Sequence, residues 1–162
     1  MIATTTITEL RAEVDRLRAE SSNGRADLSG RDFSGLEARA LNFSGCNLSG
    51  TDFSGGRFDE CDFSGSNLAG CTFYRTGLKG SILSGTDLSG ADLAEADLSN
   101  ANLSNANMPG CDLNGAKLIG ATLQGTILAS ADLTSAMMPN GEVYVSAAHD
   151  DMITSNWGGI LR

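Results

Sequence analysis

The chain has 162 residues, of which 41% are hydrophobic and 6% aromatic, and a formal net charge of −9. This negative charge repels phosphate backbones, so we expect no direct nucleic-acid binding. No apolar run reaches the length of about eighteen residues that a transmembrane helix needs, and no membrane partner is expected. The N-terminus lacks the basic and apolar regions of a signal peptide, and we therefore expect a cytoplasmic protein.

An amphipathic helix is predicted for residues 4–20, within an N-terminal segment 1–25. Its apolar residues recur at spacings of 3, 4 and 3, which places them in one stripe: Ile7, Leu10, Val14 and Leu17. A Thr near its start can cap it, and the polar run 21–24 ends it. We interpret the helix as a cap over the open end of the next domain, where unpaired strand edges would otherwise meet water. A short coiled-coil dimer is the alternative, so monomer and homodimer both stay open.

Residues 26–140 repeat one unit of five residues without a change of register. Every fifth residue from Leu28 to Met138 is Leu, Phe or Met, except Ala38, and we call these residues the centres. The residue two before a centre is usually small, the residue one before is mostly Asp or Asn, and the residue two after is mostly Gly. A period of five fits neither a helix nor a flat strand. The centres can share one interior if the chain turns a corner every five residues, and four corners close a coil of about twenty residues that stacks on the next coil.

Residues twenty positions apart share a column of such a solenoid. The N-terminal half is predicted to have an aromatic interior and the C-terminal half an aliphatic one, because the early centres include Phe33, Phe43, Phe53, Phe63 and Phe73. The first coil differs from the others. Its centre Ala38 is small, whereas Leu36 and Leu41 occupy slots that are normally small. This exchange indicates adaptation to a docked helix.

The five-residue units at 86–105 read TDLSG, ADLAE, ADLSN and ANLSN. They resemble the A-(D/N)-L-x-x consensus of the pentapeptide-repeat family, and the resemblance covers 26–140. It implies an all-β fold, a right-handed quadrilateral parallel β-helix of about six coils, with the handedness supplied by the family. The family includes cyanobacterial developmental regulators and gyrase-protecting quinolone-resistance proteins, and the latter resemble B-DNA in size and acidity.

All four cysteines occupy the small slot two residues before a centre: Cys46, Cys61, Cys71 and Cys111. Cys71 and Cys111 share a column but lie two coils apart, about 9.6 Å at strand spacing, which is too far for a disulfide. No CxxC pair is present. We expect reduced, buried thiols, no metal site and no cofactor.

The residue before each centre is predicted to point outward. One column of these residues contains five aspartates, interrupted by Thr72: Asp32, Asp52, Asp92, Asp112 and Asp132. At about 4.8 Å per coil, this acidic column is roughly 24 Å long. It is either a charged binding surface or part of the fold, since Asp side chains accept backbone hydrogen bonds at turns.

The segment 71–81 departs most from the repeat. It places Tyr74 and Arg75 in outward positions, with Lys79 nearby. Tyr and Arg are the residue types that anchor protein interfaces, so these three are candidate partner-binding residues together with the acidic column. Ordinary surface variation is the alternative interpretation.

A C-terminal segment, 141–162, follows the turn at Pro139 and Asn140. A short strand is predicted at 142–145, and later apolar residues either cover the last coil or make a dimer contact: Met152, Ile153, Trp157, Ile160 and Leu161. The sequence MPNG at 138–141 resembles the endings of cyanobacterial family members. His149, with its acidic neighbours, is interpreted as an exposed turn.

Catalysis is not expected, and no catalytic residue is predicted. A nucleophile needs an oriented base, and the single His lies in the C-terminal segment, outside the repeat. We therefore predict a non-catalytic scaffold that binds a protein partner along a flat face. The alternative is an acidic DNA mimic that binds DNA gyrase or another topoisomerase.

Overall fold

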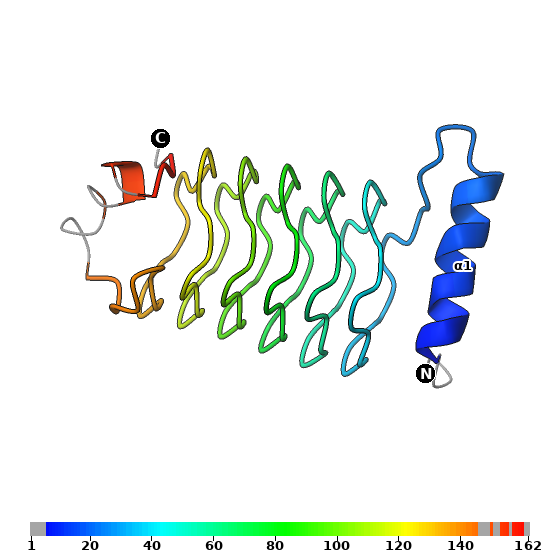
Figure 1. Cartoon of the computed structure of the whole chain (residues 1–162), viewed down its shortest axis with the longest axis horizontal. Helices are drawn as coiled ribbons and strands as arrows, with labels where there is room; N and C mark the ends of the chain where they lie inside the picture. Colours follow the sequence, from blue (N-terminus) through cyan, green and yellow to red (C-terminus); the bar gives the residue numbers. More distant parts are fainter. Residues whose placement is uncertain (1–5, 146–149, 151–152, 156, 161–162) are drawn as a thin grey trace.

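The computed structural model describes residues 6–145, 150, 153–155 and 157–160. Helix α1 spans Ile7–Glu20 and lies at one end of a rod-shaped coil (Figure 1). The β-structure of the coil consists of isolated bridges, each one residue long on either side, rather than of extended strands. Within the described ranges, no helix has both the length and the apolar character that crossing a membrane requires.

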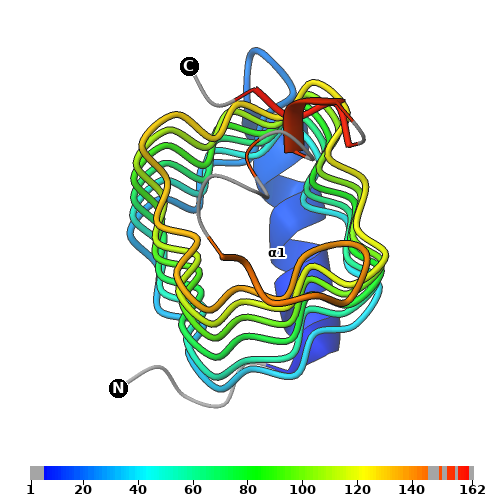
Figure 2. The same ribbon diagram turned by 90° about the vertical axis from the view of Figure 1, so that its left-hand side faces the viewer.

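Parallel bridges join residues twenty positions apart, from Asp27 with Asn47 to Lys117 with Met137. The amide of each centre from Leu28 to Leu118 donates to the coil that follows, as from Leu28 N to Asn47 O at 2.8 Å. Viewed along its axis, the coil has a four-sided outline (Figure 2). The last residue of each unit from Gly30 to Ser135 turns the corner in a left-handed conformation, such as Gly30 at φ 65°, which explains the glycines there. The predicted period and register are confirmed.

The centres form one continuous core. Every centre from Leu28 to Met138 is at most 7% exposed. In the N-terminal half, Phe53 stacks on Phe73 with ring centroids 4.6 Å apart, and Phe43 stacks on Phe63 at 5.1 Å. The two stacks meet edge to face, with Phe53 and Phe63 at 5.9 Å. The predicted aromatic interior is therefore confirmed.

Three cysteines in the small slot each donate one hydrogen bond inward. Cys61 Sγ donates to Ala38 O at 2.7 Å, Cys71 Sγ to Leu48 O at 2.9 Å, and Cys111 Sγ to Leu88 O at 2.8 Å. All four cysteines are free and buried, as predicted. Burial raises the pKa of these three thiols to about 12, so they stay protonated and keep the donor.

Helix α1 packs its apolar stripe against the first coil. Thr6 caps the helix and Glu9 completes a capping box, and the backbone leaves the helix at Ser21. Leu10 and Val14 are 0% and 2% exposed within the core, and the outer residues of the predicted stripe, Ile7 and Leu17, are partly buried against it.

Polar contacts from α1 replace a missing coil. Elsewhere, carbonyls such as Asp62 O accept an amide from the preceding coil, but the first coil has none. Arg18 donates instead to Asn42 O at 3.1 Å and Ser44 O at 2.9 Å. Arg31 stands in a slot that normally holds a small residue, and it turns outward to pair with Glu13 of α1 at 2.9 Å. The periodicity did not reveal these polar contacts.

A hairpin ends the regular coil. Val143 pairs antiparallel with Met137, and Tyr144 N donates to Ala136 O at 2.7 Å, consistent with the short strand predicted after the turn. Ile160 then pairs in parallel with Ile127, and Ile153 is fully buried in the core. The predictions for Met152, Leu161 and His149 fall outside the described residues.

Candidate partner-binding surface

The acidic column forms one line along the coil. Successive parallel bridges connect the five aspartates through Thr72, in the predicted order of Asp32, Asp52, Thr72, Asp92, Asp112 and Asp132. The structure thus places the five carboxylates on one face. Whether that face binds a partner stays a prediction.

Each aspartate of the column also accepts a backbone hydrogen bond within its own turn. Asp32 Oδ1 accepts the amide of Ser34 at 2.9 Å, and the other four accept the amide two residues ahead in the same way. Asn42 and Asn102 make this hydrogen bond in another column, so the turn needs the oxygen and not the charge. The hydroxyl of Ser34, followed by its amide, lowers the pKa of Asp32, and Thr134 lowers the pKa of Asp132 in the same way.

Tyr74 and Arg75 meet at the corner that follows the acidic column. The Arg75 guanidinium lies over the Tyr74 ring, 4.9 Å from its centroid. Glu95, one coil further on, accepts from Arg75 Nε at 2.7 Å and from the Tyr74 hydroxyl at 3.3 Å. The Arg75 and Glu95 side chains are 62% and 48% exposed, so water screens this ion pair and it adds little stability.

Arg75 and Glu95 occupy strained backbone positions. Their φ angles of 55° and 57° are left-handed, at a site of the repeat where glycine is usual. A residue with a Cβ is disfavoured in this conformation. Six other non-glycine residues share this conformation at the same position of the repeat, so the exposed Tyr74–Arg75–Glu95 cluster, rather than the backbone strain, makes this corner a candidate contact site.

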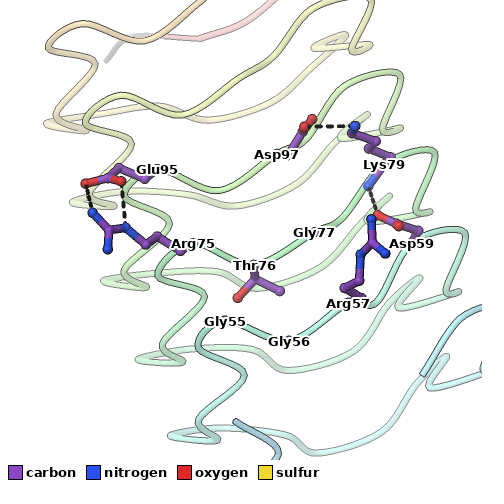
Figure 3. A pocket seen from close by; sticks show the side chains of 10 residues that line it. All are labelled: Gly55, Gly56, Arg57, Asp59, Arg75, Thr76, Gly77, Lys79, Glu95 and Asp97. Carbon is purple, nitrogen blue, oxygen red and sulfur yellow. Dashed lines mark hydrogen bonds and ion pairs between the residues drawn. The ribbon is translucent and has the colours of Figure 1, made fainter. Parts of the chain in front are cut away.

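A shallow hollow of about 330 Å³ lies beside this corner (Figure 3). Its walls carry equal numbers of both charges, and its other lining residues are small; the lining consists of Gly55, Gly56, Arg57, Asp59, Arg75, Thr76, Gly77, Lys79, Glu95 and Asp97. Lys79 Nζ pairs with Asp97 at 3.2 Å on one wall, and Arg75 pairs with Glu95 on the other. The structure thus brings Lys79 to the same hollow as Arg75.

The glycine at position 77 opens the hollow. Gly77 stands where the repeat normally has Asp or Asn, so its turn lacks its own side-chain acceptor. Asp59, from the preceding coil, reaches across and accepts the amide of Lys79 at 2.9 Å. A Cβ at Gly77 would lie 3.1 Å from that carboxylate oxygen, whereas one at the buried Gly56 would meet the core ring of Phe58 at 2.5 Å. The glycine at 77, in place of Asp or Asn, is a sequence signal for the hollow that the repeat period alone does not reveal.

No cluster of three or more metal-binding side chains occurs in the part of the chain that the structure describes. The surface features described above include ion pairs, turn carboxylates and a polar hollow. Such groups suit recognition of a charged protein surface.

Comparison with known proteins identifies the repeat. The model of the pentapeptide-repeat family matches residues 24–58, 57–94, 73–110 and 96–134. No curated protein sequence matches the chain.

Solved structures of pentapeptide-repeat proteins are similar to the chain. Rfr23 of the cyanobacterium Cyanothece 51142 is 24% identical, with a TM-score of 0.50 over 84% of this chain and 99% of its own. A protein of the Arabidopsis thaliana thylakoid lumen is 28% identical, with a TM-score of 0.45 over 84% of this chain and 79% of its own. QnrB1, a plasmid-mediated fluoroquinolone resistance protein, is 17% identical, with a TM-score of 0.32 over 84% of this chain and 85% of its own. From its matched repeats, this chain belongs to the pentapeptide-repeat family.

Proposed function

We propose that the protein is a non-catalytic scaffold that binds a protein partner at the corner formed by Tyr74 and Arg75, with Lys79 across the adjoining hollow. The observation that carries the proposal is the Tyr74–Arg75–Glu95 cluster. It combines an aromatic ring and a guanidinium, the groups that dominate interface energetics, at a backbone position that glycine would satisfy better. Since an exposed ion pair stabilises the fold little, binding is a better reason for these side chains than stability.

The proposed scaffold is a stack of about six coils between residues 26 and 140, with α1 as its N-terminal cap. The capping role is supported by the buried Leu10 and Val14 and by the hydrogen bonds from Arg18 to carbonyls at the edge of the first coil. A closed end keeps the edge from pairing with a second molecule. The flat faces are then left for a partner.

A capture experiment with two variants tests the proposed contact. Tyr74→Ala combined with Arg75→Gly removes both side chains, and glycine suits the φ of 55° at position 75, so the fold is expected to remain intact. Glu60→Gly is the matched control, because Glu60 has a φ of 60° at another corner and pairs with Arg39. Immobilised wild type and Glu60→Gly are expected to retain the same protein from a lysate of the source organism, and the double variant to lose it. Equal retention by all three would contradict the proposal.

The acidic column favours a second candidate function, a mimic of DNA that binds gyrase or another topoisomerase. Its five carboxylates lie in line along a rod, as the five aspartates are joined by consecutive bridges. The charge density is low, because one carboxylate per coil corresponds to one charge per about 5 Å, against one per about 1.7 Å in duplex DNA. The corner contact is therefore the leading proposal.

Changing the five aspartates to asparagine separates the two functions. If the column mimics phosphates, inhibition of purified gyrase by this variant should fall and lose its salt dependence. If the Tyr74 corner is the contact, the asparagine variant should keep its captured partner. A wild-type chain that does not affect gyrase supercoiling would remove the mimic from consideration.

A further inference from the structure

We infer that the hollow beside Tyr74 binds an acidic side chain of a protein partner, with Arg57 as the group that receives its carboxylate. This inference rests on the proposed protein-binding function and specifies the chemistry of the partner. It assigns a role to the hollow itself, whereas the proposed contact above depends on the exposed corner.

Two of the three cations that line the hollow are held in ion pairs. Arg75 pairs with Glu95 and Lys79 with Asp97, while Asp59 is 8% exposed and accepts the Lys79 amide. The exposed Arg57 side chain has no hydrogen-bond or ion-pair partner among the residues that the structure describes. A guanidinium offers parallel N–H donors that match the two oxygens of a carboxylate. The hollow therefore contains one unused donor group for an acidic side chain.

Space for the ligand comes from Gly77. This residue bridges to Arg57 in the preceding coil of the same column, where the other coils carry Glu37, Asp97, Lys117 and Met137. With no side chain at 77, nothing at that position covers the hollow above Arg57. The volume of about 330 Å³ is far larger than the roughly 30 Å³ that one water molecule occupies, so a carboxylate side chain fits.

The surrounding charge selects a protein segment rather than a polyanion. The chain carries a net charge of −9, and Glu95 and Asp97 line the hollow in ion pairs, so a nucleic acid would be repelled. A single acidic residue flanked by basic ones meets Arg57 with its carboxylate, while its cations suit the negative net charge of the chain. The expected partner segment is thus acidic at its centre and basic on both sides.

Nuclear magnetic resonance of the full chain with ¹⁵N-labelled arginine tests this directly. The probe is the synthetic peptide Lys-Gly-Glu-Gly-Lys, and the reference peptide has Gln in place of Glu. The Arg57 Nε–H resonance, assigned by its loss in Arg57→Gln, is expected to shift saturably with the Glu peptide. Binding of the Gln peptide is expected to be roughly tenfold weaker, because the charge-assisted hydrogen bonds are lost.

Two further variants locate the binding. Gly77→Asp restores the usual residue of the repeat, supplies the turn with its own acceptor and fills the hollow, so the shift with the Glu peptide should disappear. The unchanged amide spectrum of distant coils checks that this variant is folded. Lys117→Gln removes an exposed cation at a more distant coil of the same column, and should bind like the wild type. Equal binding of both peptides, binding retained by folded Gly77→Asp, or tighter binding of inorganic phosphate than of the Glu peptide would each overturn the inference.

The captured partner distinguishes this inference from the proposed function. A partner that is lost with Tyr74→Ala and Arg75→Gly but kept by Arg57→Gln would overturn the carboxylate site and leave the scaffold standing. Peptide binding at Arg57, together with a partner that is insensitive to Tyr74 and Arg75, would support the hollow and contradict the proposed corner contact.

Discussion

Single side chains in the interior determine whether the coil can stack. Leu98 is a centre in the middle of the chain and is fully buried. Leu98→Ala is expected to lower the free energy of unfolding by about 2–5 kcal/mol through lost burial and a residual cavity. Leu98→Asp should abolish cooperative folding, because it buries an unpaired charge. Urea denaturation followed by circular dichroism measures both, with the 39% exposed Ile119→Ala as a control expected to change stability little. A Leu98→Asp variant that unfolds like the wild type would show that the register is wrong.

The turn carboxylates are expected to make the free energy of unfolding depend on pH. Hydrogen bonds from Ser34 and Thr134 lower the pKa of Asp32 and Asp132 below the ordinary value of 3.8. The stabilisation is therefore complete above the ordinary value and is lost as the pH falls through the lower pKa of the folded state. Asp32→Asn with Asp132→Asn keeps the acceptor oxygen but removes the titration. The urea midpoint of the wild type should fall more between about pH 5 and about pH 2 than that of the double variant, and parallel profiles would contradict this explanation.

At the scale of elements, α1 packs against the first coil, and we propose that it caps this end. Removing residues 1–23 would expose the first coil and leave the carbonyls of Asn42 and Ser44 without Arg18. Unpaired edges favour pairing with other chains, so the shortened protein is expected to associate end to end. Sedimentation velocity at several concentrations measures this, and Arg18→Ala, which keeps the helix, should associate less. Unchanged stoichiometry after the deletion would rule out the cap, while a dimer that becomes a monomer would favour the coiled coil.

At the scale of the whole molecule, the acidic column sets the charge but is not expected to set the fold. Changing all five aspartates to asparagine would alter the net charge from −9 to −4. Since Asn42 and Asn102 accept the same turn hydrogen bond, the melting temperature is expected to stay close to that of the wild type. Thermal unfolding followed by circular dichroism measures it. A collapse of stability would mean that the carboxylate charge itself is needed at these corners.

Repetition explains why so much of the whole fold could be read from the sequence. Proteins of this family form right-handed quadrilateral β-helices, and the likeness to Rfr23 shows the same fold. Each unit contacts its neighbours in the coil and one coil on either side, so a rule for five residues fixes the coil by repetition. The handedness came from the family, because a spacing of five residues is compatible with either hand.

The sequence by itself determined the register, the buried centres, the inward thiols and the line of five aspartates, since each follows from position within the repeat. Tertiary structure decided what happens where the repeat is broken. Arg18 donates to carbonyls that have no preceding coil, Arg31 pairs with Glu13, and Asp59 accepts the amide of Lys79. These contacts join residues 18 to 26 positions apart. Such contacts depend on the path of individual side chains. Periodicity fixes the path of the backbone. It does not show which side chain makes the hydrogen bonds that a neighbouring coil or a turn residue would otherwise make, because that depends on distances in the folded chain.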